Sequence, residues 1–449
     1  MSRVRDDDTD DVQRLQKKLT AEGVHTLIAQ FTDIHGVAKG KLVPLAHLGT
    51  LLHTGAGFSG PSIAGTGLPR MGPRSEYYAR GDASTARALP WMPGCARIVC
   101  DGFVAGAPFD ACPRQVLRRQ IARLAERGWL MQTGIEPEFF LLRRGPNGIE
   151  PADPQDRLDK PSYDLKSLPR QHGFLAELAD GLRACELDVF QTDHEDAHGQ
   201  YEINFMHDQA LASADALMLF KQAAHALAER HGSVFSMMPK PFANQPGSGL
   251  HFHVSLWQGE RSLFDSTAEG MPALLRHFIG GVLAHSAALC AIAAPTVNSY
   301  KRLVVGESLS GTSWAPAVVA HGPNNRTALV RTLPGRFEWR LPDASANPYL
   351  ASAALIAAGL DGIDRRLEPG AECTDDLFER TPAELAARGI EVLPQNLAEA
   401  VTAFEADTTL RNTFGEALSI EFIRLKRAEW SAYARHVSAW ELERYADLF

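Results

Sequence analysis

The sequence predicts an α+β protein of two domains, a small mostly β domain and a larger one built on a mainly antiparallel sheet. At 449 residues the chain is too long for one ordinary core. Short strand-like pieces separated by turns fill residues 25–104, and farther along helices alternate with strands. Because no strand is followed by a Gly-rich phosphate loop, we expect an α+β fold and not a doubly wound nucleotide-binding fold.

Composition and charge narrow the classes of function. An apolar share of 45% and a charged share of 22% are typical of a globular protein. The 45 basic residues against 54 acidic ones give a net charge of -9, which argues against nucleic acid or an anionic membrane as the main partner. Residues 277–300 lack Lys, Arg, Asp and Glu, but Pro295 and many small residues indicate a buried core helix ending near Pro295 and no membrane span.

The first residues and the cysteines predict the cellular compartment of the protein. Residues 1–11 form an acidic tail with no apolar segment, so we expect a solvated tail in place of a signal peptide and a cytoplasmic protein. The six cysteines lack C-x-x-C spacing, which favours free, mostly buried thiols.

The first domain is expected to span residues 12–108. Val12–Glu22 has the apolar spacing of an amphipathic helix. His25–Phe31 and Val37–Val43 are predicted to pair as a hairpin through a turn that contains Gly36.

The second domain, residues 109–449, combines helices and strands and is mostly helical after Asn347. Predicted helices are Pro113–Arg127, Gly173–Cys185 and Ser213–Arg230, the last one capped by Ser213. Predicted strands are Gly134–Leu142, Asp188–Gln191, Gln200–Phe205, Gly249–Leu256 and Ala328–Leu341.

Glu136 and Glu138 stand two residues apart in the apolar strand Gly134–Leu142 and therefore point to the same face. Like charges on one face of a buried strand repel, so they require a cation between them or protonation of one carboxyl. A divalent metal satisfies this requirement. The alternative for this segment alone is an edge strand whose glutamates reach solvent.

Two further clusters favour a metal site, although each also has a simpler interpretation. Glu195 and Glu202 flank a turn at Gly199 and could serve one site, or lie in a polar surface loop. His251 and His253 share one face of a strand that follows a Gly-rich turn, a common way to present imidazoles to a metal or a phosphate; two half-exposed histidines on an edge strand are the alternative.

A group of arginines completes the candidate site. The segment Arg336–Arg340 alternates charges around Glu338 on one strand face, which suits a site that binds both a metal and an anion, or else a solvated face. Carboxylates with imidazole fit Mg²⁺ or Mn²⁺, and several guanidinium groups fit a polyphosphate. Together they indicate phosphoryl transfer without a P-loop. The arginines considered are Arg302, Arg326, Arg331, Arg336 and Arg340.

These segments together resemble the glutamine synthetase family over nearly the whole chain. The matching motifs, in chain order, are Gly134–Phe140, Gly199–Glu202, Gly247–His253, Asn298–Leu303, Asn325–Thr327, Arg336–Asp343 and Ala346–Ala351. The resemblance implies a β-grasp-like N-terminal domain and a catalytic domain with a curved antiparallel sheet. It also implies active sites shared between subunits of a ring-shaped homo-oligomer, a dodecamer.

The resemblance implies a role for each candidate residue, with ATP as co-substrate and two or three Mg²⁺ or Mn²⁺ ions per site. One metal would be held by Glu138, Glu195 and Glu202 and another by Glu136, His251 and Glu338. ATP would be bound by His253, Ser255, Arg326, Arg331 and Arg336. Glutamate would be bound by Gly247, Arg302 and Arg340, of which the two arginines are also catalytic. In the family the γ-carboxylate attacks ATP to give γ-glutamyl phosphate, from which an amine displaces phosphate.

The sequence departs from the ammonia-using pattern of the family at several positions. Ser59 stands where that pattern has an aspartate that binds and deprotonates ammonium, and Glu307 is a displaced counterpart of the flap acid; we assign both to the catalytic set. Pro246 replaces the usual Asn before Gly247. Leu377–Glu379 lacks the tyrosine that is adenylylated in many bacterial members, so that regulation is not expected.

Loss of the ammonium aspartate should weaken binding of the bare cation and favour a substituted amine. The segments 30–39, 302–306 and 435–445 resemble the branch that contains γ-glutamylmethylamide synthetases and type III glutamine synthetases. We therefore predict ligation of glutamate to methylamine. Ammonia and longer amines or polyamines are the alternative acceptors, and a non-catalytic structural or sensor protein is the alternative of another class.

Overall fold

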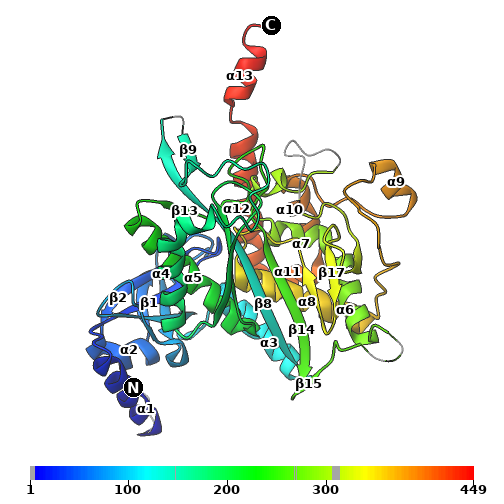
Figure 1. Ribbon diagram of the computed structural model, residues 1–449. Helices are drawn as coiled ribbons and strands as arrows, with labels where there is room; N and C mark the ends of the chain where they lie inside the picture. Colours follow the sequence, from blue (N-terminus) through cyan, green and yellow to red (C-terminus); the bar gives the residue numbers. More distant parts are fainter. Residues whose placement is uncertain (1–5, 147, 267, 269, 306–313) are drawn as a thin grey trace.

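The computed structural model describes residues 6–146, 148–266, 268, 270–305 and 314–449. Two sheets and a layer of helices make up the molecule, with the N-terminal helix at one end and the C-terminal helix projecting from the other (Figure 1). The α+β fold class predicted from the sequence is confirmed.

The smaller sheet has the order β2-β1-β6-β4-β3, with β5 and β7 added to β6. Neighbouring strands are antiparallel except β1 and β6, which are parallel. The predicted hairpin is confirmed, because Thr26–Thr32 pairs antiparallel with Ala38–Pro44. The strands are β1 (Thr26–Thr32), β2 (Ala38–Pro44), β3 (Ala56–Ser59), β4 (Glu76–Gly81), β5 (Arg87–Ala88), β6 (Cys95–Val104) and β7 (Ala107–Pro108).

The larger sheet has the order β10-β11-β8-β14-β18-β17-β16. It is mainly antiparallel as predicted, and only β16 and β17 pair in parallel among the described strands. The strands are β8 (Leu130–Gly145), β9 (Gly148–Pro151), β10 (Val189–His194), β11 (Gln200–Phe205), β12 (Asp208–Gln209), β13 (Val234–Ser236), β14 (Leu250–Gln258), β15 (Arg261–Ser262), β16 (His321–Pro323), β17 (Val330–Leu333) and β18 (Arg336–Trp339).

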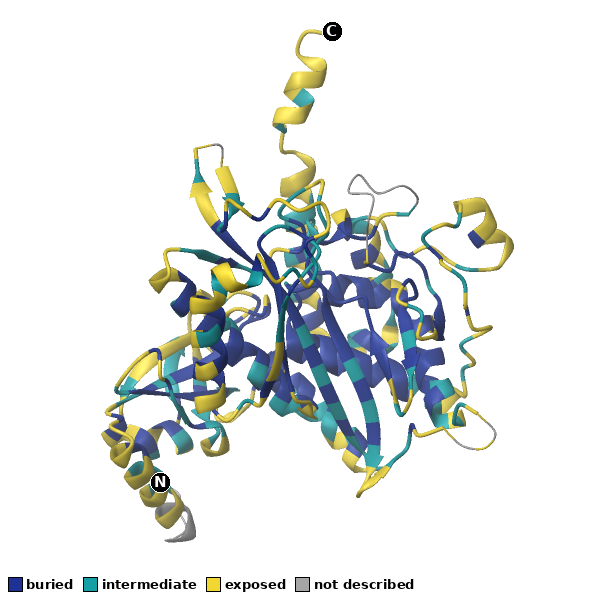
Figure 2. Cartoon of the chain, in the orientation of Figure 1, coloured by how far each residue is buried: buried dark blue, intermediate teal, exposed yellow. Residues whose placement is uncertain are grey.

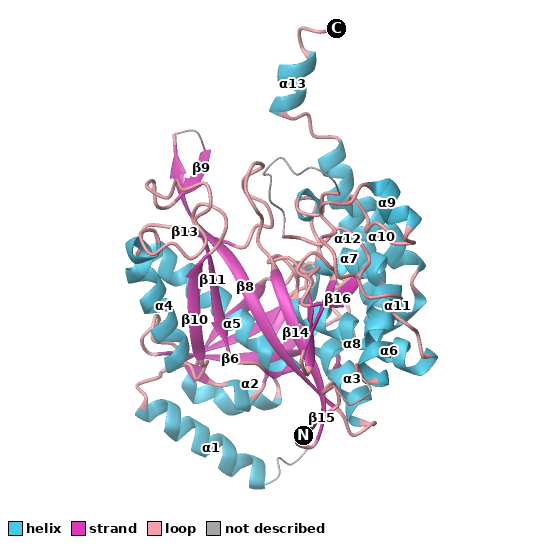
Figure 3. Cartoon of the chain, turned by 45° about the vertical axis from the view of Figure 1, so that its right-hand side comes forward, coloured by secondary structure: helices cyan, strands magenta, loops and turns pink. Residues whose placement is uncertain are grey.

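Helices pack against the larger sheet and fill the C-terminal part of the chain (Figure 3). The α-helices are α1 (Asp6–Ala21), α2 (Leu48–His53), α3 (Pro113–Ala125), α4 (His172–Ala184), α5 (Ala210–Arg230), α6 (Ala273–Ala284), α7 (Ser286–Ala293), α8 (Pro348–Arg365), α9 (Pro382–Ala387), α10 (Leu397–Ala406), α11 (Thr408–Phe414), α12 (Glu416–Ala434) and α13 (Ala439–Tyr445). Short 3₁₀ turns are η1 (Leu45–His47), η2 (Gly60–Ser62), η3 (Ala83–Thr85), η4 (Leu168–Gln171) and η5 (Ser299–Lys301).

Alternation along the strands separates a core face from a cavity face. Phe139 of β8 is fully buried and contacts Phe174 of α4 and Phe220 of α5. The neighbouring Glu138 points to the other side of the sheet. Alternating buried and partly buried positions along β8 and β14 are visible in Figure 2. One face of the sheet is therefore covered by helices, and the other can line a site.

A buried ionic network connects the smaller sheet to the helices. Arg114 of α3 pairs with Asp215 of α5 at 2.8 Å, with Asp101 of β6 at 2.9 Å and with Asp82 at 3.0 Å. Tyr349 of α8 donates a hydrogen bond to Asp215 at 2.6 Å. The network fixes how the smaller sheet sits against the larger part of the chain.

Two predicted helices differ from the structure at their start. Among the described residues the first helix spans Asp6–Ala21 and extends N-terminal to Val12, so part of the expected solvated tail is helical. Ser213 is not a cap, because α5 begins at Ala210. Its buried hydroxyl instead donates to the main-chain oxygen of Thr133 at 2.6 Å.

Two other predicted elements are interrupted. The strand expected over Ala328–Leu341 is a hairpin, because Pro334 and Gly335, the latter at φ +70°, form a turn between β17 and β18. The core helix expected before Pro295 is two buried helices, α6 and α7, bent by 74° at His285. In the described part of the chain no single helix is long and apolar enough to cross a membrane, and only this bent pair reaches the length and composition together.

Candidate functional site

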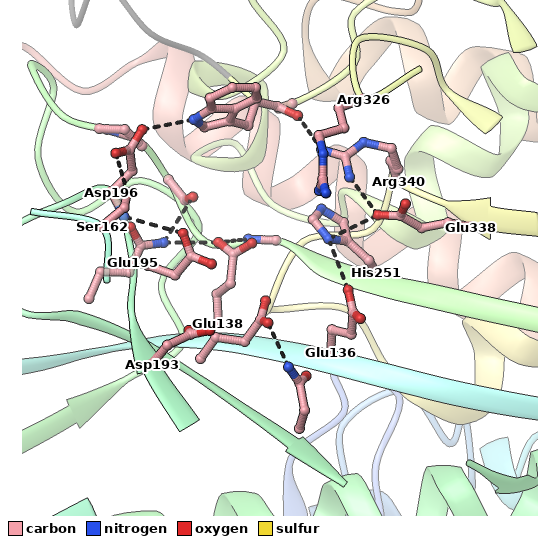
Figure 4. Close-up of a pocket in the computed structure, with 18 of the residues that line it drawn as sticks. Glu136, Glu138, Ser162, Asp193, Glu195, Asp196, His251, Arg326, Glu338 and Arg340 are labelled. Carbon is pink, nitrogen blue, oxygen red and sulfur yellow. Dashed lines mark hydrogen bonds and ion pairs between the residues drawn. The ribbon is translucent and has the colours of Figure 1, made fainter. Parts of the chain in front are cut away.

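A cavity of about 680 Å³ lies on the uncovered face of the larger sheet. Glutamates, histidines and arginines from β8, β11, β14 and β18 point into it (Figure 4). Predicted site residues that line this one cavity are Glu136, Glu138, Glu195, Glu202, Gly247, His251, His253, Arg302, Arg326, Arg331, Arg336, Glu338 and Arg340. The fold therefore brings together residues that are spread over some two hundred positions of the sequence.

Strand register brings the carboxylates close together. In the antiparallel pairs of β8, Glu138 lies opposite Glu202 of β11, and Glu136 lies opposite His251 of β14. On the other side of β14, His253 lies opposite Glu338 of β18. Side chains directly opposite each other on one sheet face are near neighbours, so the register brings together the strand residues of two clusters.

The first cluster consists of Glu138, Glu195 and Glu202, whose carboxylate oxygens lie within 4.8 Å of one another. Gln200 and the Gly249 amide donate to Glu138 at 2.9 and 2.7 Å. Among the described residues, none of the three carboxylates forms an ion pair with a basic side chain. Burial and the neighbouring carboxylates raise the pKa of Glu195 and of Glu202 well above the usual range.

The second cluster contains Glu136, Glu338 and the two histidines. His253 Nε2 lies 3.0 Å from Glu136, whereas His251 Nδ1 lies 3.7 Å from Glu136 and 3.4 Å from Glu338. Oxygen and nitrogen atoms of Glu136, His253 and Glu338 lie within 4.8 Å of one another, so the distances leave both histidines as possible ligands. The predicted assignment of His251 to the metal stays a prediction.

Basic groups compensate the carboxylates of the second cluster. Arg331 donates to Glu338 at 2.8 Å, and Arg340 also donates to this carboxylate. Burial by itself would raise the pKa of Glu338, but the nearby charges of His251 and Arg340 lower it to about 2. Burial likewise opposes ionisation of Glu136, and the neighbouring imidazoles of His251 and His253 lower its pKa.

The donor sets fit divalent cations. The first cluster crowds three carboxylates, two of them buried, and among the described residues no basic side chain forms an ion pair with them, so a cation between them would offset their repulsion. Carboxylate oxygens with at most one imidazole are ligands that suit Mg²⁺ or Mn²⁺. Glu138, Glu195 and Glu202 would hold one ion, and Glu136 and Glu338 with one histidine would hold another.

The wall opposite the carboxylates is basic. Arg302 is buried, with Nη1 at 4.0 Å from the buried Asp343 carboxylate. A side chain at Gly247 would put its Cβ 2.2 Å from the Pro239 carbonyl oxygen and 2.6 Å from Arg302, so only glycine fits there. Arg326 and Arg336 are exposed at the rim. This side of the cavity therefore suits anionic groups.

A second cavity of about 380 Å³ adjoins the first and shares Glu136, His253 and Arg336 with it. Ser255 lines only this second cavity, where its hydroxyl accepts a hydrogen bond from the Trp257 indole at 2.9 Å. The residues assigned to ATP therefore line two adjoining cavities, from the carboxylate clusters in the first cavity to Ser255 in the second.

The two remaining predicted residues are not among the described residues that line either cavity. Ser59 is exposed at the end of β3 and accepts a hydrogen bond from Ser62 at 3.1 Å. Glu307 lies outside the described residues.

Sequence reasoning missed several residues that line the cavity, among them Tyr163, Phe190, Asp196 and Trp314. Asp196 lies in the acidic segment that follows β10, and the acidic residues around it are a signal that could have identified it as a site residue. The aromatic residues lie on loops or on an exposed strand end, where no periodic pattern marks them.

Comparison with known proteins agrees with this geometry. The sequence profile described as "Glutamine synthetase, catalytic domain" matches residues 110–445. The chain belongs to the glutamine synthetase family. The resemblance predicted from its motifs is thus confirmed.

Relatives within the glutamine synthetase family differ in their named activity. The chain is 48% identical to a glutamate–methylamine ligase of Methyloversatilis universalis over 439 residues, covering 97% of this chain and 99% of that protein. It is 38% identical to a glutamine synthetase of Rhizobium meliloti over 432 residues, covering 95% and 98%. A solved structure titled "GmaS/ADP complex-Conformation 1" superposes with a TM-score of 0.90 at 38% identity, covering 96% of this chain and 99% of that one.

Proposed function

We propose that this protein ligates the γ-carboxylate of L-glutamate to methylamine at the expense of ATP. The observation that carries the proposal is the cavity that brings two carboxylate clusters together with several arginines. Identity of 48% to a glutamate–methylamine ligase, against 38% to glutamine synthetases, favours methylamine over ammonia as the acceptor.

Glutamate would lie against Gly247, Arg302 and Arg340. The guanidinium groups would hold the γ-carboxylate, and the close approach allowed by Gly247 would let the main chain contact the amino acid. Fixing the carboxylate in this way orients one oxygen toward the γ-phosphorus of ATP.

ATP would extend from the second cavity toward the carboxylate clusters. Ser255 lies in that cavity and Arg336 in both, while Arg326 and Arg331 line the first cavity only and would meet phosphate oxygens. Divalent ions held by the two clusters would neutralise the phosphate charge that develops during transfer. Attack by the carboxylate oxygen on the γ-phosphorus would release ADP and form γ-glutamyl phosphate.

The amine would then attack the acyl carbon, and phosphate would leave as the carbon–nitrogen bond forms. The attacking nitrogen must be neutral, so a base has to accept a proton from the alkylammonium ion. Glu195 of the first cluster lines the cavity and is the candidate for this contact. Arg340 would stabilise the negative charge on the acyl oxygen.

The test is a comparison of acceptors with purified protein. Phosphate release is measured with ATP, Mg²⁺ and glutamate while ammonium, methylamine, ethylamine or putrescine is varied. The proposal expects the highest kcat/KM for methylamine. A preference for ammonium would assign glutamine synthetase activity, a preference for putrescine would assign a polyamine ligase, and no turnover with any amine would assign a non-catalytic protein.

We further propose that the active protein is a homo-oligomer, a dodecamer, whose sites are shared between subunits. Ser59 is exposed and does not line the cavity of its own chain, so its predicted role in catalysis would place it in the site of a neighbour. The C-terminal helix α13 projects from the body (Figure 1) and exposes apolar side chains that a second subunit would cover. They are Trp440 and Leu442 in α13, with Val437 before the helix and Leu448 and Phe449 after it. Light scattering of the purified protein measures the assembly directly.

We also propose a domain boundary and a cellular location for this protein. We place the domain boundary between residues 108 and 109, just after β7 ends and before α3 begins at Pro113. We also keep the cytoplasm as the location, which the six free, buried cysteines support.

A further inference from the structure

Trp314 connects the two sides of the cavity. Its indole Nε1 donates to Asp196 Oδ2 at 2.8 Å, and its main-chain oxygen accepts a hydrogen bond from Arg340 Nη2 at 3.1 Å. Arg340 also bonds Glu338 in the second cluster, while Asp196 follows Glu195 of the first cluster in sequence. Figure 4 shows these two partners of Trp314, Asp196 and Arg340, on opposite sides of the cavity.

The Asp196 carboxylate accepts a second hydrogen bond besides the one from Trp314. Its other carboxylate oxygen accepts a hydrogen bond from the Ser162 hydroxyl, and the next residue, Tyr163, donates its main-chain N–H to the His194 carbonyl at 2.9 Å. One carboxylate therefore ties together the turn after β10, the loop that carries Tyr163 and the segment that carries Trp314. Both aromatic side chains line the cavity.

The position of Trp314 is unusual for so large an apolar side chain. Its indole N–H is satisfied, yet the residue is 46% exposed, and the exposed part borders a cavity lined mostly by charged groups. Because its main-chain oxygen is bonded to Arg340 and its indole to Asp196, Trp314 extends from the group assigned to hold the reacting γ-carboxylate toward the side of the first cluster. A second substrate that approaches this carboxylate from the side of the first cluster would meet the ring.

We propose that Trp314 is the specificity-determining residue for the amine, its indole contacting the methyl group of methylammonium, and that Asp196 is a positioning residue that holds the ring. This inference rests on the proposed function. Ammonium presents only N–H groups, whereas methylammonium adds one methyl group that gains from an apolar neighbour. One methyl or methylene contact changes specificity by roughly 10–200-fold, and an aromatic ring also attracts the cation itself.

The test compares kcat/KM for methylamine and for ammonium in Trp314→Ala, Trp314→Phe and wild-type enzyme. We expect Trp314→Ala to lower the methylamine-to-ammonium ratio at least about 10-fold, with the KM values for ATP and glutamate nearly unchanged. Trp314→Phe keeps an aromatic surface and should retain most of the ratio. An unchanged ratio in Trp314→Ala, or an equal loss with both amines, would overturn the proposal.

Asp196 is tested by a pair of variants. Asp196→Ala removes the acceptor of the indole N–H and should lower the ratio as Trp314→Ala does, whereas Asp196→Asn keeps an oxygen that can accept this bond and should preserve the ratio. If Asp196→Asn behaves like Asp196→Ala, the charge of Asp196 acts on the amine directly and the positioning role is wrong. Thermal unfolding and ADP binding show that each variant is folded; if Trp314→Ala is inactive with both amines, the ratio measured for Trp314→Leu decides.

The assignment of Trp314 and the proposed function can fail independently of each other. If wild-type enzyme prefers ammonium, the methylamine assignment fails, but the change in ratio on removing the indole still reports whether Trp314 contacts the substituent. If wild-type enzyme prefers methylamine and Trp314→Ala has the same ratio, the function stands and the assignment of Trp314 fails.

Discussion

Glu136 of β8 and His251 of β14 are direct cross-strand neighbours, with His251 Nδ1 at 3.7 Å from the Glu136 carboxylate. Two positions farther along β14, His253 lies opposite Glu338 and its Nε2 lies 3.0 Å from Glu136. Both imidazoles therefore lie close to the same group of carboxylates. Kinetic measurements on variants can decide which histidine binds the metal and which binds the phosphates of ATP.

The first prediction separates the two histidines. If His251 is the metal ligand, His251→Ala should raise the Mg²⁺ concentration required for half-maximal activity by at least about 10-fold. His253→Ala should instead raise the KM for ATP at saturating Mg²⁺, because His253 is assigned to the phosphates. The measurement is phosphate release over a grid of Mg²⁺ and ATP concentrations. The opposite pattern would exchange the two roles.

The second prediction concerns Glu338, which is buried and bonded by Arg331 and Arg340. Glu338→Ala removes an anionic ligand and leaves the two guanidinium groups without their partner, so we expect kcat to fall by about 10²–10³-fold or more. Glu368→Ala, which alters an exposed glutamate paired with Arg276, is the control for a general effect of losing a carboxylate. Wild-type kcat in Glu338→Ala would remove this residue from the site.

The third prediction concerns stability. Asp215 accepts hydrogen bonds from the guanidinium of Arg114 and from the hydroxyl of Tyr349. These bonds belong to the buried network between the smaller sheet and the helices. Asp215→Ala leaves a buried cation without part of its compensation and should cost about 3–5 kcal/mol in the free energy of unfolding. The exposed pair Arg127–Asp364 provides the control, because Asp364→Ala should cost no more than about 1 kcal/mol. Urea unfolding measures both, and equal losses would contradict the prediction.

The fourth prediction concerns pH. His285, at the bend between α6 and α7, bonds Asp407 and, at 3.0 Å, Asp361. Burial disfavours its charged form, but the bonds to the two carboxylates outweigh burial and raise its pKa above 6.5. Protonated His285 therefore stabilises the fold fully below pH 6.5, and this contribution is lost as the pH rises through the higher folded pKa. The pKa of Asp407 is lowered, against the effect of burial, by the bond from His285, so its contribution is lost only in acid.

The measurement for this prediction is the free energy of unfolding of wild type and His285→Gln between pH 5 and 9. The difference should be about 2 kcal/mol near pH 5.5 and should shrink as the pH rises. The exposed His47 supplies the control variant His47→Gln. A difference that grows with pH would show that neutral His285 is the stabilising form.

Local sequence patterns predicted the parts of the site that strands position. Alternation placed Glu136 and Glu138 on one face, and β8 presents both to the cavity while Phe139 packs against helices. Local patterns failed where tertiary contacts decide. Ser213 has the chemistry of a helix cap but is used inside α5 to bond the neighbouring strand, and Pro334 with Gly335 divides what apolar patterning presented as one strand.

The contact between Asp196 and Trp314 was beyond local reasoning. The two residues are separated by 118 positions and belong to loops, whose path depends on the packing of the elements that carry them. No periodicity marks a loop residue as part of a site. The motifs predicted most of the charged residues that the fold gathers in the cavity, whereas the contact of Asp196 with Trp314 emerges only from the fold.

The last prediction concerns Ser59, which is exposed and lies outside the cavity of its own chain. Ser59→Asp introduces a negative charge that should attract the small ammonium ion more than methylammonium, because the smaller cation approaches the carboxylate more closely. We expect the methylamine-to-ammonium ratio of kcat/KM to fall about 10-fold, which corresponds to about 1.4 kcal/mol. Ser62→Asp is the matched control, since Ser62 is also exposed and bonds Ser59 at 3.1 Å.

If Ser59 acts on a neighbouring subunit, the ratio should depend on assembly. Mixed oligomers made from an inactive Glu338→Ala chain that carries Ser59→Asp and an otherwise wild-type chain would show the lowered ratio, because the active sites of the wild-type chain receive the altered residue from their neighbours. Oligomers in which the wild-type chain keeps its own ratio at every mixing proportion would instead place Ser59 in the site of its own chain, or outside any site.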